Sequence, residues 1–242
     1  MSTATVKQGA TLDAAADDLL DAAADDLLDA PSTAPEHEDD RPVAQAVFAA
    51  FCYEDPDSFI GRYVSETVAD LAESGTTVYL FARRHFPGDE PGVRTHAVGD
   101  CAGEGMLGSV QEFTRCATNA FLRQFPVGTE GVTLLGYEWS AVPTLSLLHA
   151  LRDLPAVASF HSLEWERSDM SNETSWQIAE IELAGLREAR TILVHQASTA
   201  KIARHRLPEC AGRIAAAQQF FTRGGPGAGP EMLRAVHRVD QH

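Results

Sequence analysis

The chain has 242 residues, 44% of them hydrophobic and 22% charged, so it is long enough to bury one large core or two small ones. Its formal net charge is −16, and the absence of a basic stripe argues against nucleic acid or an anionic membrane surface as a partner. The sequence has no run of about 20 apolar residues and no apolar leader after Met1. We therefore expect a soluble, cytoplasmic protein with no transmembrane segment.

The cysteine pattern argues against a metal or redox centre. The four cysteines lie far apart, at Cys52, Cys101, Cys116 and Cys210, with no CxxC or mixed Cys/His cluster. Zinc sites and dithiol redox centres need such short spacings. We therefore expect reduced thiols packed in the core and no metal site.

Residues 1–41 have the composition of an acidic, low-complexity tail and linker. They contain the octapeptide LDAAADDL twice in succession, and residues 1–40 hold eleven acidic residues against Lys7 alone. A period of eight residues drifts around a helix axis, so the leucines form no fixed apolar seam. A solvated tail is the preferred interpretation, and an acidic docking helix is the alternative. Residues 221–242 are rich in glycine and proline at their start, which predicts a second linker or a frayed end.

Residues 42–220 alternate between short apolar runs and stretches with helical spacing of apolar residues. The expected strands are Val43–Phe51, Thr76–Phe81, Val93–Val98, Gly131–Gly136, Ala156–Phe160, Thr191–Val194 and Arg213–Ala217. The expected helices are Phe59–Glu73, Met106–Phe125, Ala141–Leu151, Ser171–Glu188 and Ser198–His205. Strands separated by helices pair in parallel through right-handed crossovers. The pattern predicts an α/β domain with a doubly wound, mostly parallel, Rossmann-like sheet.

Polar side chains follow two of these strands close to the point where each ends. His161 comes directly after Ala156–Phe160, and Glu138 comes two residues after Gly131–Gly136. Ligands bind beyond the carboxyl ends of parallel strands, so both residues are candidates for a site. Each also has a structural alternative. A strand-end histidine can cap backbone groups, and a glutamate is favoured at a helix N-terminus by the helix dipole.

The dinucleotide motif does not follow the first predicted strand, and two other common motifs are absent from the sequence. A dinucleotide site needs GxGxxG directly after the first strand, but the sequence there is FCYEDPDSFIG, whose single glycine is Gly61. No P-loop is present, and no GxSxG indicates a hydrolase nucleophile. The three acidic residues before Gly61 in this segment, Glu54, Asp55 and Asp57, also disfavour a phosphate.

The segments VASFHSLEWERS, IAEIELAGLREAR and TILVHQASTAKIA follow one another in this order. Together they resemble the amino-terminal domain of family 4 (group 1) glycosyltransferases, which is one half of the GT-B fold. Upstream, GRYVSETVADLAESGTTVYLFARR is similar to the family's first helix and second strand. VTLLGYEWSAVPTLSLLHALRDLP is similar to its next strand and helix. The resemblance covers roughly Val43 to Ala217.

The resemblance implies catalytic roles for His161 and Glu138. His161 matches the family's strand-end histidine, which faces the donor sugar and its phosphate. An imidazole there can hydrogen-bond a sugar hydroxyl or the departing phosphate. Glu138 matches an acidic residue that orients the acceptor or a neighbouring side chain.

The resemblance also implies five donor-binding or substrate-binding residues, with departures from the family pattern. The family's first loop has a Gly-Gly pair that approaches the donor pyrophosphate, whereas this chain has Ser58 and Phe59 there, with Gly61 two residues later. The family's usual serine after the sixth strand is His195, followed by Ser198 and Thr199.

We expect packing or solvated roles for the other polar and aromatic residues near these strand ends. Trp139 and Trp165 are expected to pack in the core or at an interface, although a tryptophan can also stack on a sugar ring. His195 is expected to be structural. Glu164, Glu166 and Arg167 are expected to form a solvated charged turn. The exposed pair Arg83 and Arg84 can receive a phosphate, but such arginines usually bind nothing specific.

The implied activity is that of the acceptor-side half of a retaining glycosyltransferase, with a nucleotide-sugar donor as substrate, a carbohydrate acceptor and no cofactor. The family places most nucleotide-binding residues, including an E-x7-E motif, in a second domain, whereas this sequence ends at His242. We therefore expect the chain to catalyse poorly without a carboxyl-terminal half. The alternative is a non-catalytic, degenerate glycosyltransferase-like module that acts as a partner or scaffold.

Overall fold

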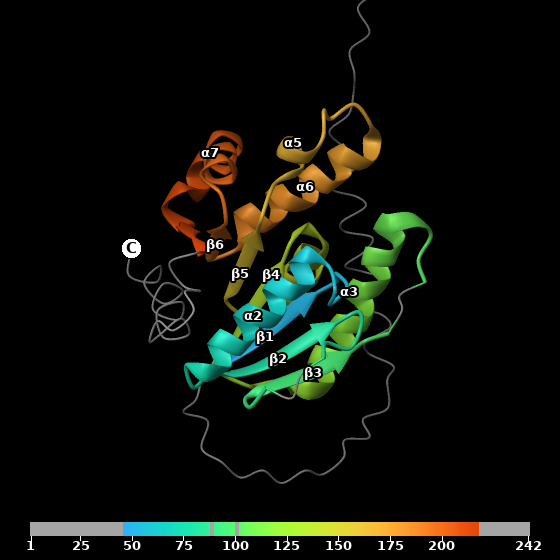
Figure 1. Ribbon diagram of the computed structural model, residues 1–242, viewed down its shortest axis with the longest axis vertical. Helices are drawn as coiled ribbons and strands as arrows, with labels where there is room; N and C mark the ends of the chain where they lie inside the picture. The colour runs from blue at the N-terminus through green and yellow to red at the C-terminus, as the bar shows by residue number, and fades with distance from the viewer. Residues whose placement is uncertain (1–45, 88–89, 100–101, 218–242) are drawn as a thin grey trace, which may run out of the picture. The chain divides into compact units, whose positions relative to one another are not determined.

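A computed structural model of the chain describes residues 46–87, 90–99 and 102–217 (Figure 1). The predicted acidic tail over residues 1–41 and the predicted linker over residues 221–242 lie outside this range. Among the residues described, no helix is both long and apolar enough to cross a membrane.

Seven parallel strands form one sheet in the order β3-β2-β1-β4-β5-β6-β7. The strands are β1 (Val47–Cys52), β2 (Thr77–Ala82), β3 (Val93–Ala97), β4 (Val132–Tyr137), β5 (Ala156–Phe160), β6 (Thr191–Val194) and β7 (Ile214–Ala216). The chain builds the sheet outward in one direction from β1 to β3 and then in the other from β4 to β7. This reversal confirms the predicted doubly wound, Rossmann-like sheet.

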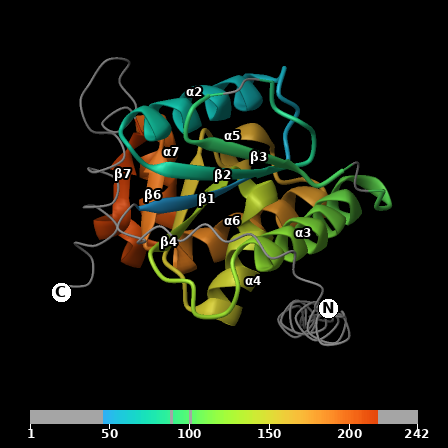
Figure 2. The same cartoon turned by 90° about the horizontal axis from the view of Figure 1, so that it is seen from below.

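Apart from the segment between β2 and β3, in which no helix is described, the connecting segments are helical. They are α2 (Phe59–Glu73), α3 (Gly105–Gln124), η1 (Trp139–Ala141), α4 (Val142–Arg152), α5 (Glu164–Arg167), α6 (Glu173–Glu188), α7 (Ala197–Arg206) and η2 (Pro208–Arg213). Helix α2 covers one face of the sheet, and α3, α4 and α6 cover the other (Figure 2). Each of these helices runs back from the carboxyl edge of the sheet, so their first turns all lie at that edge.

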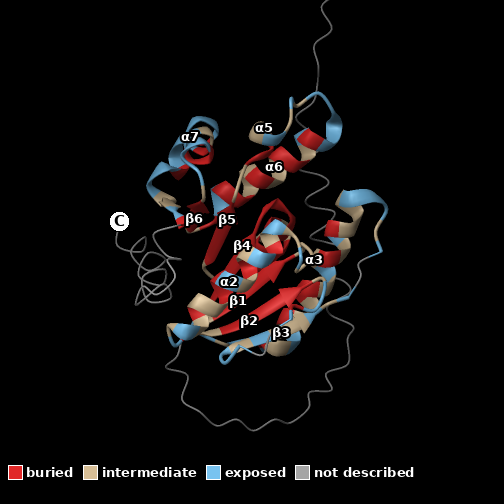
Figure 3. Ribbon diagram, viewed as in Figure 1, coloured by how far each residue is buried: buried red, intermediate tan, exposed pale blue. Residues whose placement is uncertain are grey.

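The strands form the core between the two helical layers. β4 and β5 are buried along their whole length (Figure 3), which is why they read as unbroken apolar runs. Alternate residues of β1 face opposite layers: Phe48 packs with α2, and Phe51 packs with the α3 side. Cys52 and Cys210 are buried free thiols, as expected, whereas Cys116 on α3 is a free thiol that is only partly buried and so does not belong to the core. Cys101 lies outside the described residues.

The predicted elements match the observed ones with small shifts at their ends. The spans Phe59–Glu73, Ala156–Phe160 and Thr191–Val194 are confirmed as predicted. The first strand begins at Val47, later than the predicted Val43. The helix predicted over Ser171–Glu188 begins at Glu173, because Asn172 caps it by accepting a hydrogen bond from the Ser175 N–H.

Candidate functional site

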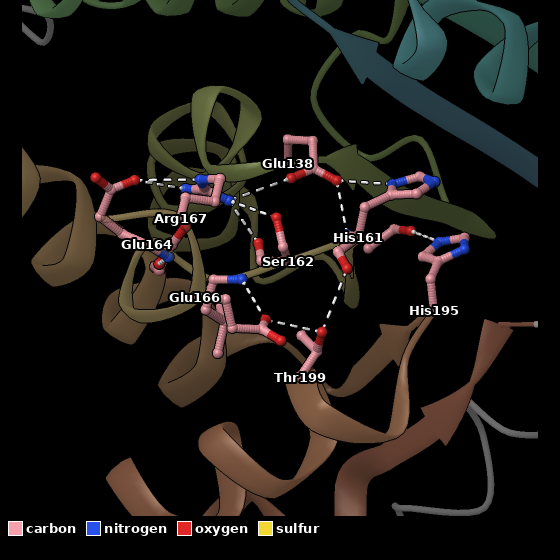
Figure 4. Close-up of polar contacts among 11 residues, drawn as sticks. Glu138, His161, Ser162, Glu164, Glu166, Arg167, His195 and Thr199 are labelled. Carbon is pink, nitrogen blue, oxygen red and sulfur yellow. Dashed lines mark hydrogen bonds and ion pairs between the residues drawn. The ribbon is translucent and has the colours of Figure 1, made fainter. Parts of the chain in front are cut away.

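The carboxyl ends of β4 and β5 bring Glu138 and His161 into contact (Figure 4). One carboxylate oxygen of Glu138, Oε1, accepts the His161 backbone N–H at 2.7 Å and lies 2.8 Å from His161 Nδ1. Both side chains are largely shielded, with 8% of Glu138 and 13% of His161 exposed. The two predicted catalytic residues therefore form one carboxylate–imidazole pair.

Glu138 has an unusual backbone conformation that aims its side chain at His161. Its φ is 63° and its ψ is 172°, a region that residues other than glycine rarely occupy and that costs about 1–3 kcal/mol. Its N–H donates to the Ser159 carbonyl oxygen at 2.8 Å, and its own carbonyl accepts the Ala141 N–H at 3.1 Å. The strained residue is therefore held between β5 and the start of η1.

The contact with Glu138 fixes the chemical form of His161. A carboxylate only accepts hydrogen bonds, so Nδ1 is the ring nitrogen that carries the proton. Within the described part of the chain, Nε2 of His161 has no hydrogen-bond partner. In the neutral imidazole this nitrogen has a lone pair for a ligand hydroxyl, and in the imidazolium it is a donor.

His195 stacks on His161, which makes it part of the site. The two ring centroids are 3.6 Å apart and the ring planes differ by 8°. Tyr63 from α2 stands edge-on to both imidazoles, with a centroid separation of 4.5 Å in each case. Burial, together with the neighbouring His161, lowers the pKa of His195 to about 3. His195 therefore stays neutral at physiological pH.

The segment Glu164–Arg167 is not the solvated turn that the sequence predicts. It forms the short helix α5, and Glu164 is buried. Arg167 Nη2 lies 2.6 Å from Glu182 Oε1 and 3.0 Å from Glu164 Oε2. Arg167 Nη1 donates to the Ser162 carbonyl at 2.6 Å and lies 3.9 Å from Glu138 Oε2. One guanidinium thus ties the loop after β5 to α6 and to the Glu138–His161 pair.

Glu182 is a buried anchor that sequence reasoning missed. Its side chain is fully buried on α6, and its Oε2 accepts the Glu164 N–H at 2.7 Å. Burial raises the pKa of Glu182 to about 7, although Arg167 lowers it. The sequence does contain an indication that Glu182 is buried. Glu182 lies four residues from both Ile178 and Leu186, which places it on the apolar side of the helix.

Thr199 and Ser198 differ in their relation to the site. Thr199 is fully buried, and its hydroxyl lies 2.9 Å from Glu166 Oε2 and 3.3 Å from the His161 carbonyl oxygen. Thr199 therefore holds the loop that carries His161 (Figure 4). Ser198 is exposed and donates to Gln196 at 3.4 Å, and no hydrogen bond joins it to His161 within the described residues.

The first turn of α2 lies beside His161 and is held in place by hydrogen bonds and close packing. Ser58 caps the helix: its Oγ donates to the Asp55 carbonyl at 2.6 Å and accepts the Gly61 N–H at 2.9 Å. A Cβ on Gly61 would lie 2.0 Å from the Asp55 carbonyl oxygen, so only glycine fits there. Phe59 projects from this turn and touches His161 edge-on, with centroids 5.3 Å apart.

Arg83 and Arg84 are both paired with Asp55. The arginine nitrogens lie 3.0 and 3.1 Å from Asp55 Oδ1, and the Arg83 guanidinium also stacks over the Tyr53 ring at 4.6 Å.

Trp139 is buried in an apolar cluster with Val110 and Ile178, which confirms the expected packing role. Over residues 46–217, apart from the undescribed gaps, no group of His, Cys, Asp or Glu side chains could hold a metal ion.

Comparison with solved structures identifies the fold. A sucrose-phosphate synthase of Thermosynechococcus elongatus superposes with a TM-score of 0.51 and 16% identity, over 81% of this chain and 98% of that one. A second structure of the same enzyme gives 0.56 and 16%, over 72% and 48%. A UGT transferase of Siraitia grosvenorii, solved in complex with UDP, gives 0.50 and 11%, over 71% and 50%. No protein-family model and no curated protein matches the chain.

These likenesses, all at low identity, define the fold as that of one half of a GT-B glycosyltransferase. The chain spans about half the length of the second sucrose-phosphate synthase structure and of the UGT transferase.

Proposed function

We propose that this chain is the acceptor-side half of a nucleotide-sugar-dependent glycosyltransferase, with His161 and Glu138 at the reacting groups. The observation that carries the proposal is the contact between Glu138 Oε1 and His161 Nδ1 at the carboxyl edge of β4 and β5. This edge is where ligands bind in doubly wound sheets, and the backbone strain at Glu138 is of the kind that clusters at functional sites.

In this proposal Glu138 orients His161, and His161 accepts or donates a hydrogen bond at the reacting groups. Glu138 fixes the His161 ring and its tautomer, which leaves Nε2 to accept a hydrogen bond from a sugar hydroxyl. The imidazolium form can instead donate to the departing phosphate and stabilise its charge. A positioned acid or base of this kind contributes about 10²–10⁴-fold to a rate.

The finer assignment is to the retaining glycosyltransferases of family 4. It is supported by the order of the segments around His161 and by the likeness to sucrose-phosphate synthase. In a front-face displacement the leaving phosphate takes the acceptor's proton, so the protein mainly provides positioning and electrostatic stabilisation. The UDP bound in the UGT transferase supports a nucleoside diphosphate sugar as the donor class.

The proposal includes a second Rossmann-like half that holds the donor nucleotide. It is supported by the share of the relatives' length that this chain spans. Half of a two-domain site lacks most of the donor's binding energy and the positioning that makes transfer fast. We therefore expect rapid transfer only when a complementary carboxyl-terminal half is supplied.

Sugar transfer by the full chain tests the proposal. Purified chain is incubated with UDP-, GDP- and ADP-glucose and a panel of sugar acceptors, with and without purified carboxyl-terminal GT-B halves. Transfer that His161→Ala lowers at least 100-fold, with folding intact, supports the proposal. His205→Ala is the matched control, because His205 is exposed on α7. Equal transfer by His161→Ala and the unaltered chain contradicts it.

A non-catalytic module is the second candidate, and one observation favours it. The first turn of α2 has Ser58 and Phe59 in place of the expected glycine pair, and the Ser58 hydroxyl already occupies the Gly61 N–H. This turn is therefore a poor pyrophosphate site. No transfer with any donor, acceptor or second half, together with no binding of any sugar, would favour the module.

A further inference from the structure

Phe59 is an aromatic side chain left open to solvent beside the candidate site. It is 67% exposed, although a phenylalanine normally buries most of its surface. It is the first residue of α2 and lies at the carboxyl edge of the sheet. Exposed apolar residues that occur singly need no explanation, so the argument depends on how Phe59 is held and what it adjoins.

The turn that carries Phe59 is fixed on both sides. Ser58 accepts the Gly61 N–H and donates to the Asp55 carbonyl, and Gly61 packs directly on that carbonyl. The Asp55 carboxylate is in turn paired with Arg83 and Arg84. Phe59 therefore projects from a rigid turn, and presenting its ring to a ligand loses little backbone entropy.

Phe59 and His161 are close enough to touch one ligand. Their ring centroids are 5.3 Å apart and the ring planes differ by 79°. Within the described residues, Nε2 of His161 has no hydrogen-bond partner. An aromatic surface next to a hydrogen-bonding nitrogen suits a ligand that has both an apolar face and hydroxyl groups.

The charges near the first turn of α2 disfavour a phosphate on a sugar bound at Phe59. Burial and the nearby Glu138 raise the pKa of Glu54, so the carboxylates before α2 already disfavour one another's charge. Arg83 and Arg84, which follow β2, are already paired with Asp55. A phosphate carried by the acceptor sugar at Phe59 would therefore lie near carboxylates and a capped helix end.

We infer that Phe59 is a stacking platform for an uncharged pyranose ring of the acceptor, and that one hydroxyl of this ring reaches His161 Nε2. The C–H bonds on one face of a pyranose form an apolar surface that packs on an aromatic ring, while its hydroxyls point outward. This inference rests on the proposed function and narrows the ligand at this position to a neutral sugar.

Saturation-transfer NMR on the full chain tests the inference. The probes are the methyl glycosides of glucose, galactose and mannose, with sucrose and maltose as neutral disaccharides and glucose 6-phosphate as the anionic counterpart of glucose. The variants are Phe59→Ala, Phe59→Leu, which keeps an apolar side chain without a ring, Phe59→Trp, which keeps an aromatic face, and His161→Ala. Leu151→Ala is the matched control, because Leu151 is also an exposed apolar residue but lies at the other end of the sheet.

We expect at least one neutral sugar to bind, with saturation concentrated on its ring C–H protons. Phe59→Ala and Phe59→Leu should weaken that binding at least fivefold, whereas Phe59→Trp and Leu151→Ala should leave it within twofold. Glucose 6-phosphate should bind more weakly than the neutral glucoside. Because Phe59 is exposed, melting temperatures should stay unchanged.

Other outcomes overturn the inference in distinguishable ways. If Phe59→Ala binds the sugar as well as the unaltered chain does, while His161→Ala does not bind it, then Phe59 is not a stacking surface. The proposed function would still stand. Stronger binding of glucose 6-phosphate than of the neutral glucoside removes the restriction to an uncharged ring and with it the inference. No binding of any neutral sugar, or binding that neither Phe59→Ala nor His161→Ala changes, overturns the inference, and the transfer assay then decides the proposed function separately.

Discussion

The imidazole rings of His161 and His195 lie face to face, with centroids 3.6 Å apart and planes 8° from parallel. They belong to neighbouring strands, because each residue directly follows the last residue of β5 or β6. Two stacked imidazoles so close together cannot both take a proton without strong repulsion. Burial and His161 lower the pKa of His195, so His195 supports His161 as a neutral partner and does not compete with it for charge.

The first prediction concerns the pH dependence of stability caused by His195. Its pKa is lowered from about 6.5 to about 3 by burial and by His161, so the unfolded chain binds a proton near pH 6.5 while the folded chain does not. Stability from this residue is present above pH 6.5 and is lost as the pH falls towards 3. Between pH 8 and pH 5, the unaltered chain should lose about 2 kcal/mol more than His195→Phe, measured by urea unfolding. Parallel pH profiles would contradict the lowered pKa.

Glu182 should produce the opposite slope. Burial raises its pKa from 4.5 to about 7, so between these values the folded chain holds a proton that the unfolded chain has released. Its contribution is greatest at low pH and falls as the pH rises towards 7. From pH 6 to pH 8, the unaltered chain should lose about 1 kcal/mol relative to Glu182→Gln. A difference that stays constant over this range would show that Glu182 is ionised throughout.

Replacing Arg167 should destabilise the loop that carries His161. Arg167→Met leaves the buried Glu182 and Glu164 carboxylates without their cation, and we expect a loss of about 2–3 kcal/mol at pH 8. The loss should be smaller at pH 6, where Glu182 is protonated. Arg115→Met is the control, because the Arg115–Glu112 pair has the same spacing on an exposed helix surface and should contribute less than about 1 kcal/mol. Equal losses for the two variants would show that the Arg167 cluster contributes no more than a surface pair.

Gly61 should tolerate no side chain. The new Cβ of Gly61→Ala would lie 2.0 Å from the Asp55 carbonyl oxygen and 2.7 Å from Pro56 Cα, both of them backbone atoms. We expect a loss of about 2–3 kcal/mol in the free energy of unfolding. Gly212→Ala is the control, since a Cβ at that position would have no neighbouring atom within 4 Å, and its stability should change by less than about 0.5 kcal/mol. Similar effects at both positions would refute the close packing of Gly61 on Asp55.

The alternation of strands and helices was enough to predict the sheet, because parallel strands are continuous apolar runs and glycine or capping residues mark the helix ends. Gly75, for example, follows α2 with a φ of 88°, as a helix-ending glycine should. The contact between Glu138 and His161 was likewise predictable, since both follow strands that are neighbours in the sheet.

The rest of the site depends on tertiary contacts that have only weak local signals. From the sequence alone, the charged residues Glu164, Glu166 and Arg167 are expected to face solvent. In the folded chain Glu182 on α6 binds Arg167, and Thr199 on α7 donates a hydrogen bond to Glu166. His195 was expected to be structural, because nothing in its own segment shows that its ring lies on His161. The left-handed backbone of Glu138 is also invisible in the sequence, because glutamate is not a residue that usually adopts it.

The side-chain nitrogens of His161 offer the most direct test of the central claim, that Glu138 holds this imidazole with Nε2 presented to a ligand. Long-range ¹H–¹⁵N spectra of the histidine rings report the tautomer, with and without a neutral sugar that binds by saturation transfer. We predict an Nδ1–H tautomer for neutral His161, an Nε2 resonance that moves when the sugar is added, and loss of this tautomer preference in Glu138→Gln. An Nε2–H tautomer in the unaltered chain, or an Nε2 resonance that stays in place while the sugar binds, would contradict the account.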